Sequence, residues 1–175
     1  MTTDISYTMK HYQCNMAAFL QLGKWFDSLR EQDVYDNTRI ILVADHGHGM
    51  AQFKDMIFGE WVENTWHHPQ DVMSYNPLLL VKDFDSKGFH VDDRFMTNAD
   101  TPILALDGLI NAPVNPFTGK PITDTAKEAG EFHILYTDIS DPWDNNGNTF
   151  LPDRWYALKG HNIFDVSSWR SLGIY

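Results

Sequence analysis

Apolar residues recur every three or four positions near the start of the chain, and this spacing predicts an amphipathic helix between residues 12 and 29. Gly23 interrupts the pattern at a modest cost in helix stability. The polar segment from Arg30 to Thr38 then ends the helix and turns the chain. Three further apolar residues, Ala17, Leu20 and Trp25, widen the apolar stripe. We therefore expect the rest of the protein to cover the helix well.

Two runs of consecutive apolar residues predict buried strands. The first lies within Arg39 to Asp45 (RIILVAD) and the second within Asn76 to Phe84 (NPLLLVKDF). Strands that are apolar at successive positions are typical of parallel sheets with helices on both faces. Pro77 stands at the start of the second strand, where a missing N–H group is tolerated. We therefore expect both strands to belong to such a sheet.

A second helix is predicted from Asn98 to Ile110, where apolar residues again follow a helical spacing. Asp100 or Thr101 can cap its start, and Pro102 fits the first turn because its missing N–H group has no helical partner there.

The last third of the chain has a different character. The segment 111–124 is rich in Pro, Gly and Asn and predicts an irregular connection. Two strand-like segments follow, at 132–138 and 154–160, and predict a small antiparallel sheet. The order of elements indicates an α/β fold with a small terminal sheet. We predict a main α/β unit at 1–118 and a terminal antiparallel subdomain at 119–175.

Composition narrows the class of protein. The 175 residues are 43% hydrophobic, which is enough for a packed core, and the formal net charge is −11. That charge argues against nonspecific binding to nucleic acid or to an anionic membrane surface. The single cysteine, Cys14, excludes an internal disulfide. The aliphatic runs are far shorter than the roughly 20 residues of a membrane span, and the polar N-terminus has no signal-peptide core. We expect a soluble chain.

The end of the first strand carries the candidate chemistry. The apolar run leads directly into Asp45, His46, Gly47, His48 and Gly49. In open α/β sheets, ligands bind beyond the carboxyl ends of the parallel strands, and carboxylate oxygen and imidazole nitrogen both bind Zn²⁺ or Mn²⁺. The glycines permit the turn that both ligands would need to reach one ion. The same residues also fit a loop with a capping aspartate and exposed histidines, because two ligands alone do not make a metal site.

Three segments in series carry a resemblance to a known family. The segment from Tyr35 to Gly47 (YDNTRIILVADHG) resembles the late metal-binding motif of the alkaline phosphatase superfamily. The branch it most resembles is the sulfatase-like one, with lipoteichoic acid synthases and related phosphoglycerol transferases. The segments 76–84 and 96–110 resemble those that follow the motif there, so the resemblance covers roughly residues 15–122. It implies part of an alkaline-phosphatase-like three-layer sandwich.

The resemblance also implies roles for residues. Asp45 and His46 inherit the metal-ligand role, whereas the family's nucleophile belongs to an earlier segment that this chain does not include. Cys14 does not stand in the sulfatase nucleophile motif and is given no such role. The chain is therefore expected to be the C-terminal half of a catalytic domain and inactive alone. Because an imidazole ligand favours Zn²⁺ or Mn²⁺, we expect one of these ions in preference to Ca²⁺ or Mg²⁺.

Other histidines are candidates for contact with substrate. His48 lies just beyond the motif, and His67 and His68 lie in the loop that leaves the same strand end. Related transferases place a histidine in this region against the transferred group, although ordinary loop histidines fit the sequence as well. The remaining histidines have no motif context and are interpreted as ordinary: His11, His90, His133 and His161.

Three functions stay open at this point. The first is a fragment of a membrane-anchored bacterial phosphoglycerol transferase or phosphodiesterase that acts on an anionic phosphodiester at the extracytoplasmic face. The second is a fragment of a sulfatase, which acts on sulfate esters. The third is a non-catalytic binding domain on the same fold. A half-domain should also expose an apolar sheet edge, so self-association through that edge is expected.

Overall fold

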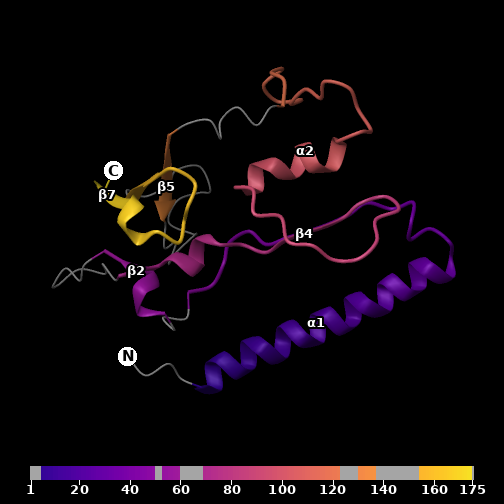
Figure 1. Cartoon of the computed structure of the whole chain (residues 1–175), viewed down its shortest axis with the longest axis horizontal. Coiled ribbons are helices and arrows are strands. Elements are labelled where there is room, and N and C mark those ends of the chain that lie inside the picture. Colours follow the sequence, from indigo (N-terminus) through magenta and orange to yellow (C-terminus); the bar gives the residue numbers. More distant parts are fainter. Residues whose placement is uncertain (1–4, 50–52, 60–68, 123–129, 137–153, 175) are drawn as a thin grey trace, which may run out of the picture.

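A computed structural model describes residues 5–49, 53–59, 69–122, 130–136 and 154–174 (Figure 1). The α-helices are α1 (Ile5–Glu31) and α2 (Thr101–Leu106). The strands are β1 (Ile40–Val43), β2 (Ile57–Phe58), β3 (Gln70–Asp71), β4 (Leu79–Lys82), β5 (Glu131–Tyr136), β6 (Arg154–Lys159) and β7 (Trp169–Ile174). Short 3₁₀ helices are η1 (Lys54–Met56), η2 (Val72–Tyr75), η3 (Asn98–Asp100) and η5 (Val166–Ser168).

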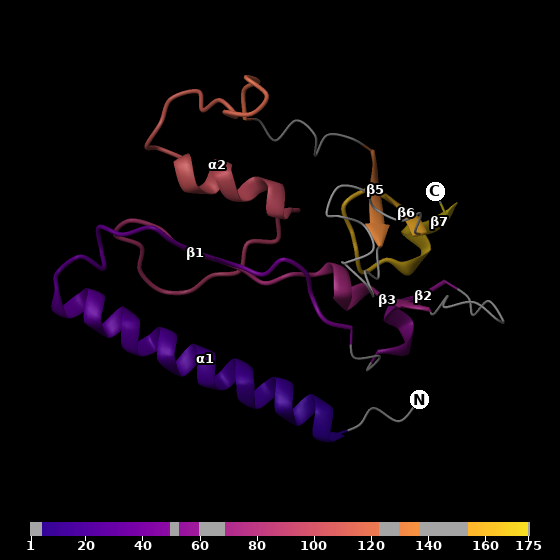
Figure 2. The same cartoon turned by 180° about the vertical axis from the view of Figure 1, so that it is seen from behind.

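The two apolar runs form strands β1 and β4, and they pair with each other. Their pairing is antiparallel, from Ile40 opposite Lys82 to Val43 opposite Leu79. The prediction of a parallel sheet was therefore wrong for these two strands. In both views the β1–β4 pair runs between α1 and α2 (Figures 1 and 2). The strands are also less buried than the apolar runs predicted, since Ile40 is buried but Val43 is 42% exposed and Val81 is 45% exposed. The runs of apolar residues therefore determined neither the burial of both faces nor the direction of pairing.

The long helix α1 is less covered than its sequence suggested. Leu22, Phe26 and Leu29, near its C-terminal end, are partly buried, but Tyr12 is 60% exposed and Leu20 is 64% exposed. With 27 residues, α1 is roughly 40 Å long. The four-residue strands β1 and β4 span only about 14 Å. The prediction of a well-covered helix was wrong because α1 is much longer than the β1–β4 strand pair beside it.

Arg39 joins β1 to the end of α2. Its guanidinium group donates to the carbonyl oxygens of Leu104 (2.9 Å) and Asp107 (2.7 Å), and the side chain is only 10% exposed. Carbonyl groups at the end of a helix have no partner within the helix, and a cation there also interacts favourably with the helix dipole. Arg39 also bonds the carboxylate of Asp83 (2.9 Å), just after β4. One partly buried cation therefore ties together β1, β4 and α2.

This network predicts a pH-dependent contribution of Asp83 to stability. The backbone N–H of Phe84 and the guanidinium of Arg39 hold the pKa of Asp83 below its ordinary value of 3.8. As pH falls, the unfolded chain takes up the proton first. The contribution is therefore complete above the ordinary pKa and is lost as pH falls through the lower folded-state pKa. Urea denaturation of the wild type and Asp83→Asn should give a stability difference at neutral pH that shrinks in acid. A difference that grows in acid would contradict this assignment.

The second predicted helix is shorter than expected. It begins with the 3₁₀ turn η3 and ends at Leu106, before Gly108, whose positive φ of 69° is typical of a glycine beyond a helix end. Asp100 stands at the N-cap of α2, as predicted, but its side chain makes no cap hydrogen bond to α2 and instead forms a capping box with Thr97, the N-cap of η3. The backbone N–H of Thr97 donates to Asp100 Oδ2 (2.6 Å), and the Thr97 hydroxyl lies 3.2 Å from the same oxygen. This capping box explains how a charged residue, Asp100, can be only 4% exposed.

The C-terminal strands form an antiparallel sheet in the order β5-β6-β7, as predicted for the first two strands. The third strand, β7, was not predicted. It contains Gly173 with φ of 107°, and its register with β6 shifts between Trp155 and Tyr156. A shift of this kind breaks the two-residue alternation by which a strand is found in a sequence.

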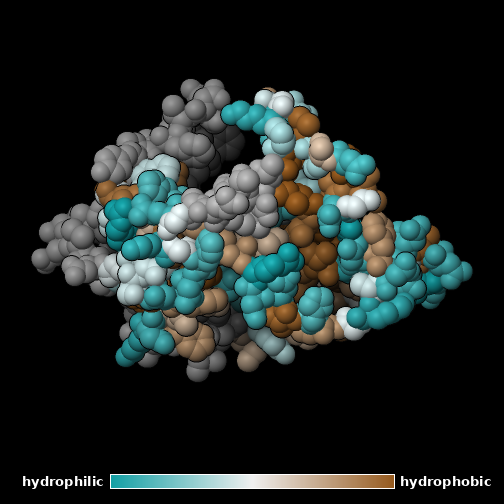
Figure 3. Space-filling view, turned by 45° about the horizontal axis from the view of Figure 1, so that its top comes forward, coloured by the Kyte–Doolittle hydropathy of each residue, from teal (hydrophilic) through white to brown (hydrophobic). Residues whose placement is uncertain are grey.

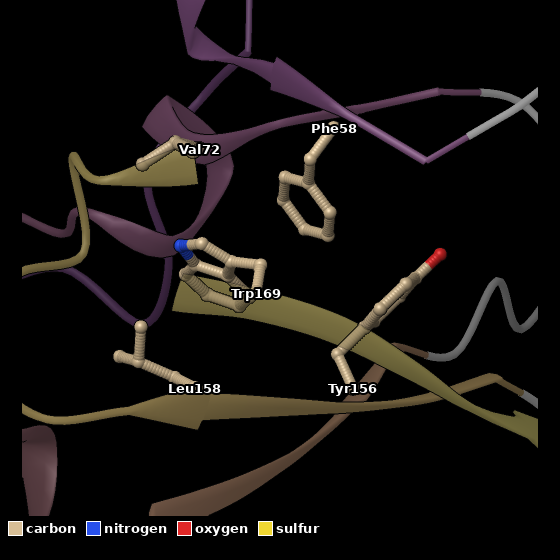
Figure 4. Close-up of a cluster of buried hydrophobic side chains, with 5 residues drawn as sticks. All are labelled: Phe58, Val72, Tyr156, Leu158 and Trp169. Carbon is tan, nitrogen blue, oxygen red and sulfur yellow. The ribbon is translucent and has the colours of Figure 1, made fainter. Parts of the chain in front are cut away.

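The main buried cluster lies where this sheet meets the segments 53–59 and 69–76. It consists of Phe58, Val72, Tyr156, Leu158 and Trp169 (Figure 4). The Phe58 ring stacks on Trp169 at 4.7 Å and meets Tyr156 edge to face at 5.1 Å. The cluster thus joins residues from both sides of the predicted boundary at 118/119, and the boundary itself stays a prediction. No helix in the described ranges is both long enough and apolar enough to cross a membrane.

Candidate metal-binding strand end

Asp45 and His46 lie just beyond β1, at the surface. Ala44 still continues the ladder, since its N–H donates to Leu78 O at 2.9 Å, and the chain then leaves the strand. The side chain of Asp45 is 89% exposed and that of His46 is 72% exposed. His46 Nε2 lies 3.8 Å from Asp45 Oδ1, so the two predicted ligands lie beside each other. The exposure leaves both groups accessible to an ion or a substrate.

The imidazole of His46 is held in one tautomer. Its Nδ1 lies 2.6 Å from the carbonyl oxygen of Gly47. A carbonyl oxygen can only accept, so Nδ1 must carry the proton. In the neutral ring, Nε2 then carries the lone pair on the side of Asp45. A hydrogen bond from the other ring nitrogen to a carbonyl is the usual way in which proteins orient a metal-binding histidine.

The two glycines of the motif are required by close packing. A Cβ atom on Gly47 would lie 1.9 Å from Met73 O and 2.7 Å from Asn76 O. A Cβ atom on Gly49 would lie 2.6 Å from both Asp71 Cβ and Ser74 Oγ. The N–H of Gly47 also donates to Ser74 O at 2.9 Å. The motif thus packs directly against η2, and this contact determines the path of the chain after His46.

Asn98 is a positioning residue that sequence reasoning missed. Its side-chain amide donates to the carbonyl oxygens of Ala44 (3.0 Å) and Asp45 (2.8 Å). The capping box of Thr97 and Asp100 holds η3, and η3 carries Asn98. The backbone of Asp45 is therefore tied to the start of α2. The only signal in the sequence was an asparagine at a predicted helix start, and many helix starts carry one for capping alone.

His48 contacts the long helix. Its ring stacks on that of His11 with centroids 4.7 Å apart and an interplanar angle of 28°. His11 was interpreted as ordinary, yet its ring joins the N-terminal half of α1 to the motif. The role of His48 in substrate binding stays a prediction.

The remaining candidates do not complete the site. His67 and His68 lie outside the described residues. Within the described ranges, no three His, Cys, Asp or Glu side chains come together in a way that could hold a metal ion. His133 lies elsewhere, 3.0 Å from Glu131 on β5, and His161 stacks on Phe95 at 4.9 Å. Cys14 is exposed on α1. The described part of the chain therefore brings two of the predicted ligands together.

Comparison with protein-family models, with curated proteins and with solved structures found no match to this chain. The resemblance to the sulfatase-like branch therefore stays a prediction.

Proposed function

We propose that Asp45 and His46 are half of a divalent-metal site in a catalytic domain of the sulfatase-like branch of the alkaline phosphatase superfamily. The proposed activity is phosphoryl transfer, as in a metal-dependent phosphoglycerol transferase or phosphodiesterase, on a partial three-layer sandwich. The substrate would be an anionic phosphodiester, and the whole enzyme would act at the extracytoplasmic face of a bacterial membrane.

The observation that carries the proposal is the pairing of Nε2 and Oδ1 at 3.8 Å, with Nδ1 tied to Gly47 O. Zinc ligands from His and Asp lie about 2.0–2.2 Å from the ion, so two of them in a tetrahedral site lie roughly 3.4 Å apart. Small side-chain rotations would close the difference, and both side chains are exposed enough to rotate. The donor set therefore fits Zn²⁺ or Mn²⁺.

The residues of this chain would each have a part in holding the ion. His46 would bind through Nε2 and Asp45 through its carboxylate. Asn98 holds the Asp45 backbone, and Gly47 packs against η2, so both ligands start from a fixed main chain. A bound divalent ion would neutralise charge on a phosphoryl oxygen and lower the pKa of a nucleophile. The family resemblance assigns that nucleophile to a segment outside this chain.

Two alternatives are kept. A sulfatase would use the same ligand pair on a sulfate ester, but the imidazole of His46 favours Zn²⁺ or Mn²⁺ over the Ca²⁺ of many sulfatases. A non-catalytic binding domain would retain the fold without turnover. Closed zinc sites use four protein ligands, and open catalytic sites use three. The further ligands would come from His48, His67, His68 or another polypeptide segment.

Zinc calorimetry tests the proposal. Half of the 10–16 kcal/mol of a four-ligand zinc site corresponds to a Kd of roughly 10⁻⁴ to 10⁻⁶ M. We expect binding in that range for the wild type and none for His46→Ala. His133→Ala, which changes an exposed histidine far along the chain on β5, is the matched control and should bind like the wild type. Tight binding that survives both His46→Ala and a His67/His68 double alanine variant would refute the strand-end site.

Turnover assays on the same proteins add a second readout. The purified chain should not hydrolyse a generic phosphodiester or aryl sulfate, because the proposed nucleophile segment is not part of it. Robust hydrolysis that Asp45→Ala abolishes would mean that this chain supplies its own nucleophile.

A further inference from the structure

The turn between α1 and β1 surrounds the ammonium group of Lys82, the last residue of β4. The turn spans residues 32–39 and lies at the right-hand end of the molecule in Figure 1. Lys82 Nζ donates to the carbonyl oxygens of Thr38 (2.9 Å), Asp36 (3.2 Å) and Tyr35. It also lies 4.5 Å from the centre of the Tyr35 ring. These three oxygens and the ring are named here the carbonyl cage, and all of them face one cation.

Other contacts also hold the oxygens of the carbonyl cage in place. The N–H of Tyr35 donates to Leu29 O, and the N–H of Thr38 donates to Tyr35 O, both at 3.2 Å. The carbonyl oxygen of Asp36 also accepts from the N–H of Asp85 at 2.9 Å. The turn is thus bonded to the end of α1 and to the chain beyond β4 without the ammonium group. We therefore expect the oxygens to keep their arrangement when that group is removed.

The donor set of the cage suits a monovalent cation that carries N–H groups. An ammonium group only donates and a carbonyl oxygen only accepts, and distances of 2.9 and 3.2 Å are those of N–H···O hydrogen bonds. The aromatic face of Tyr35 adds an attraction for a cation. The carboxylate of Asp36 is directed at Lys87 instead, with both oxygens 3.2 Å from its Nζ. Divalent ions such as Ca²⁺ and Mg²⁺ usually bind carboxylates, so the cage does not resemble a site for them.

Small cations in solution have access to this part of the protein. Figure 3 shows mostly hydrophilic residues over the right-hand end of the molecule, where the turn lies. The contact of Lys82 with Asp36 is exposed, whereas its contacts with Tyr35 and Thr38 are partly buried. The formal net charge of the chain is −11, which raises the concentration of cations near its surface.

We propose that the turn is a binding site for a cation of the ammonium class, and that Lys82 fills this site from within the chain. An ammonium group tethered to the chain loses no translational freedom on binding, so it holds the cage more strongly than a dissolved ion would. In this way Lys82 fastens the turn before β1 to the end of β4. The inference needs neither Asp45 nor His46 and is independent of the proposed metal site.

Chemical rescue of Lys82→Ala tests the inference. Removal of the charged donor should lower the equilibrium constant for folding roughly 100-fold. Propylammonium chloride supplies the atoms that the substitution deletes beyond Cβ. With a Kd of about 0.1 M, a concentration of about 1 M should restore about tenfold, and ammonium chloride should restore less. Tetramethylammonium chloride has the same charge but no N–H group and should restore nothing. Urea denaturation of variant and wild type in each salt measures these changes.

Two control variants separate the cage from general effects of charge. Lys87→Ala removes another lysine at the turn, whose side chain is 75% exposed and bonds only the Asp36 carboxylate. Its folding equilibrium constant should stay within about twofold of the wild type in every salt. Lys82→Met keeps an unbranched side chain in the cage without the ammonium group. It should lose stability as Lys82→Ala does, but propylammonium should not restore it because the space is filled.

Circular dichroism keeps the test decisive if Lys82→Ala does not fold in buffer alone. Propylammonium should then refold it and tetramethylammonium should not. The inference is overturned if Lys82→Ala is within about twofold of the wild type in stability. Equal stabilisation by propylammonium and tetramethylammonium would also overturn it, since that is a general effect of salt. The same holds if propylammonium restores Lys82→Met as well as Lys82→Ala, or if neither ammonium salt restores Lys82→Ala.

Discussion

Replacement of Gly47 by alanine is expected to destabilise the protein by about 3 kcal/mol. The new Cβ atom would lie 1.9 Å from the backbone oxygen of Met73, and a backbone atom cannot rotate away as a side chain can. Either the motif or η2 must move, and the hydrogen bond from Gly47 N to Ser74 O would break, at a further cost of about 1 kcal/mol. Urea denaturation followed by circular dichroism measures the change.

Gly23→Ala is the matched control for this experiment. Gly23 lies inside α1, and no atom lies within 4 Å of the position of a Cβ atom there. Alanine favours helix over glycine by about 1 kcal/mol, so this variant should be as stable as the wild type or slightly more stable. If Gly47→Ala instead behaves like Gly23→Ala, the motif does not pack tightly against η2, and Asp45 and His46 do not start from a fixed main chain.

Trp169→Ala is expected to lower the free energy of unfolding by about 3–5 kcal/mol. The indole is 7% exposed, stacks on Phe58 and lies 5.0 Å from the Tyr75 ring. Its Nε1–H donates to Ile163 O at 2.8 Å. Figure 4 shows the side chain in the middle of the cluster. Its removal would leave a cavity between the C-terminal sheet and the segments 53–59 and 69–76, and it would unpair the carbonyl group of Ile163.

Trp25→Ala provides the control. Trp25 lies on α1 and is 46% exposed, so its replacement should lower the free energy of unfolding by at most about 1 kcal/mol. Hydrogen exchange adds a test of location. In Trp169→Ala, protection should fall in β2 and β3 as well as in β6 and β7, since one cluster joins them. A loss confined to the C-terminal strands would show that the two segments are stabilised separately.

The sequence by itself determined where most of the regular structure lies. The helical spacing of apolar residues located α1, and the consecutive apolar runs located β1 and β4 within a few residues. The same signals located β5 and β6 and the antiparallel character of the terminal sheet. It also indicated that Asp45 and His46 follow a strand end, because a change from apolar to polar residues beside glycine is a local signal. The preference of a segment for helix, strand or turn depends on residues close to one another in the chain, so it can be predicted from the sequence alone.

Only the tertiary structure decided how these pieces meet. The antiparallel pairing of β1 with β4 and the exposure of the N-terminal half of α1 depend on what lies beside each element. The contact of Phe58 with Trp169 joins residues more than a hundred positions apart, and the bonds of Asn98 to Ala44 and Asp45 join residues more than fifty apart. The close approach of Gly47 to the backbone oxygen of Met73 likewise depends on how the motif packs against η2. Contacts between distant residues leave no periodic pattern in the chain, and the free energy of burial that selects them is shared among many residues at once.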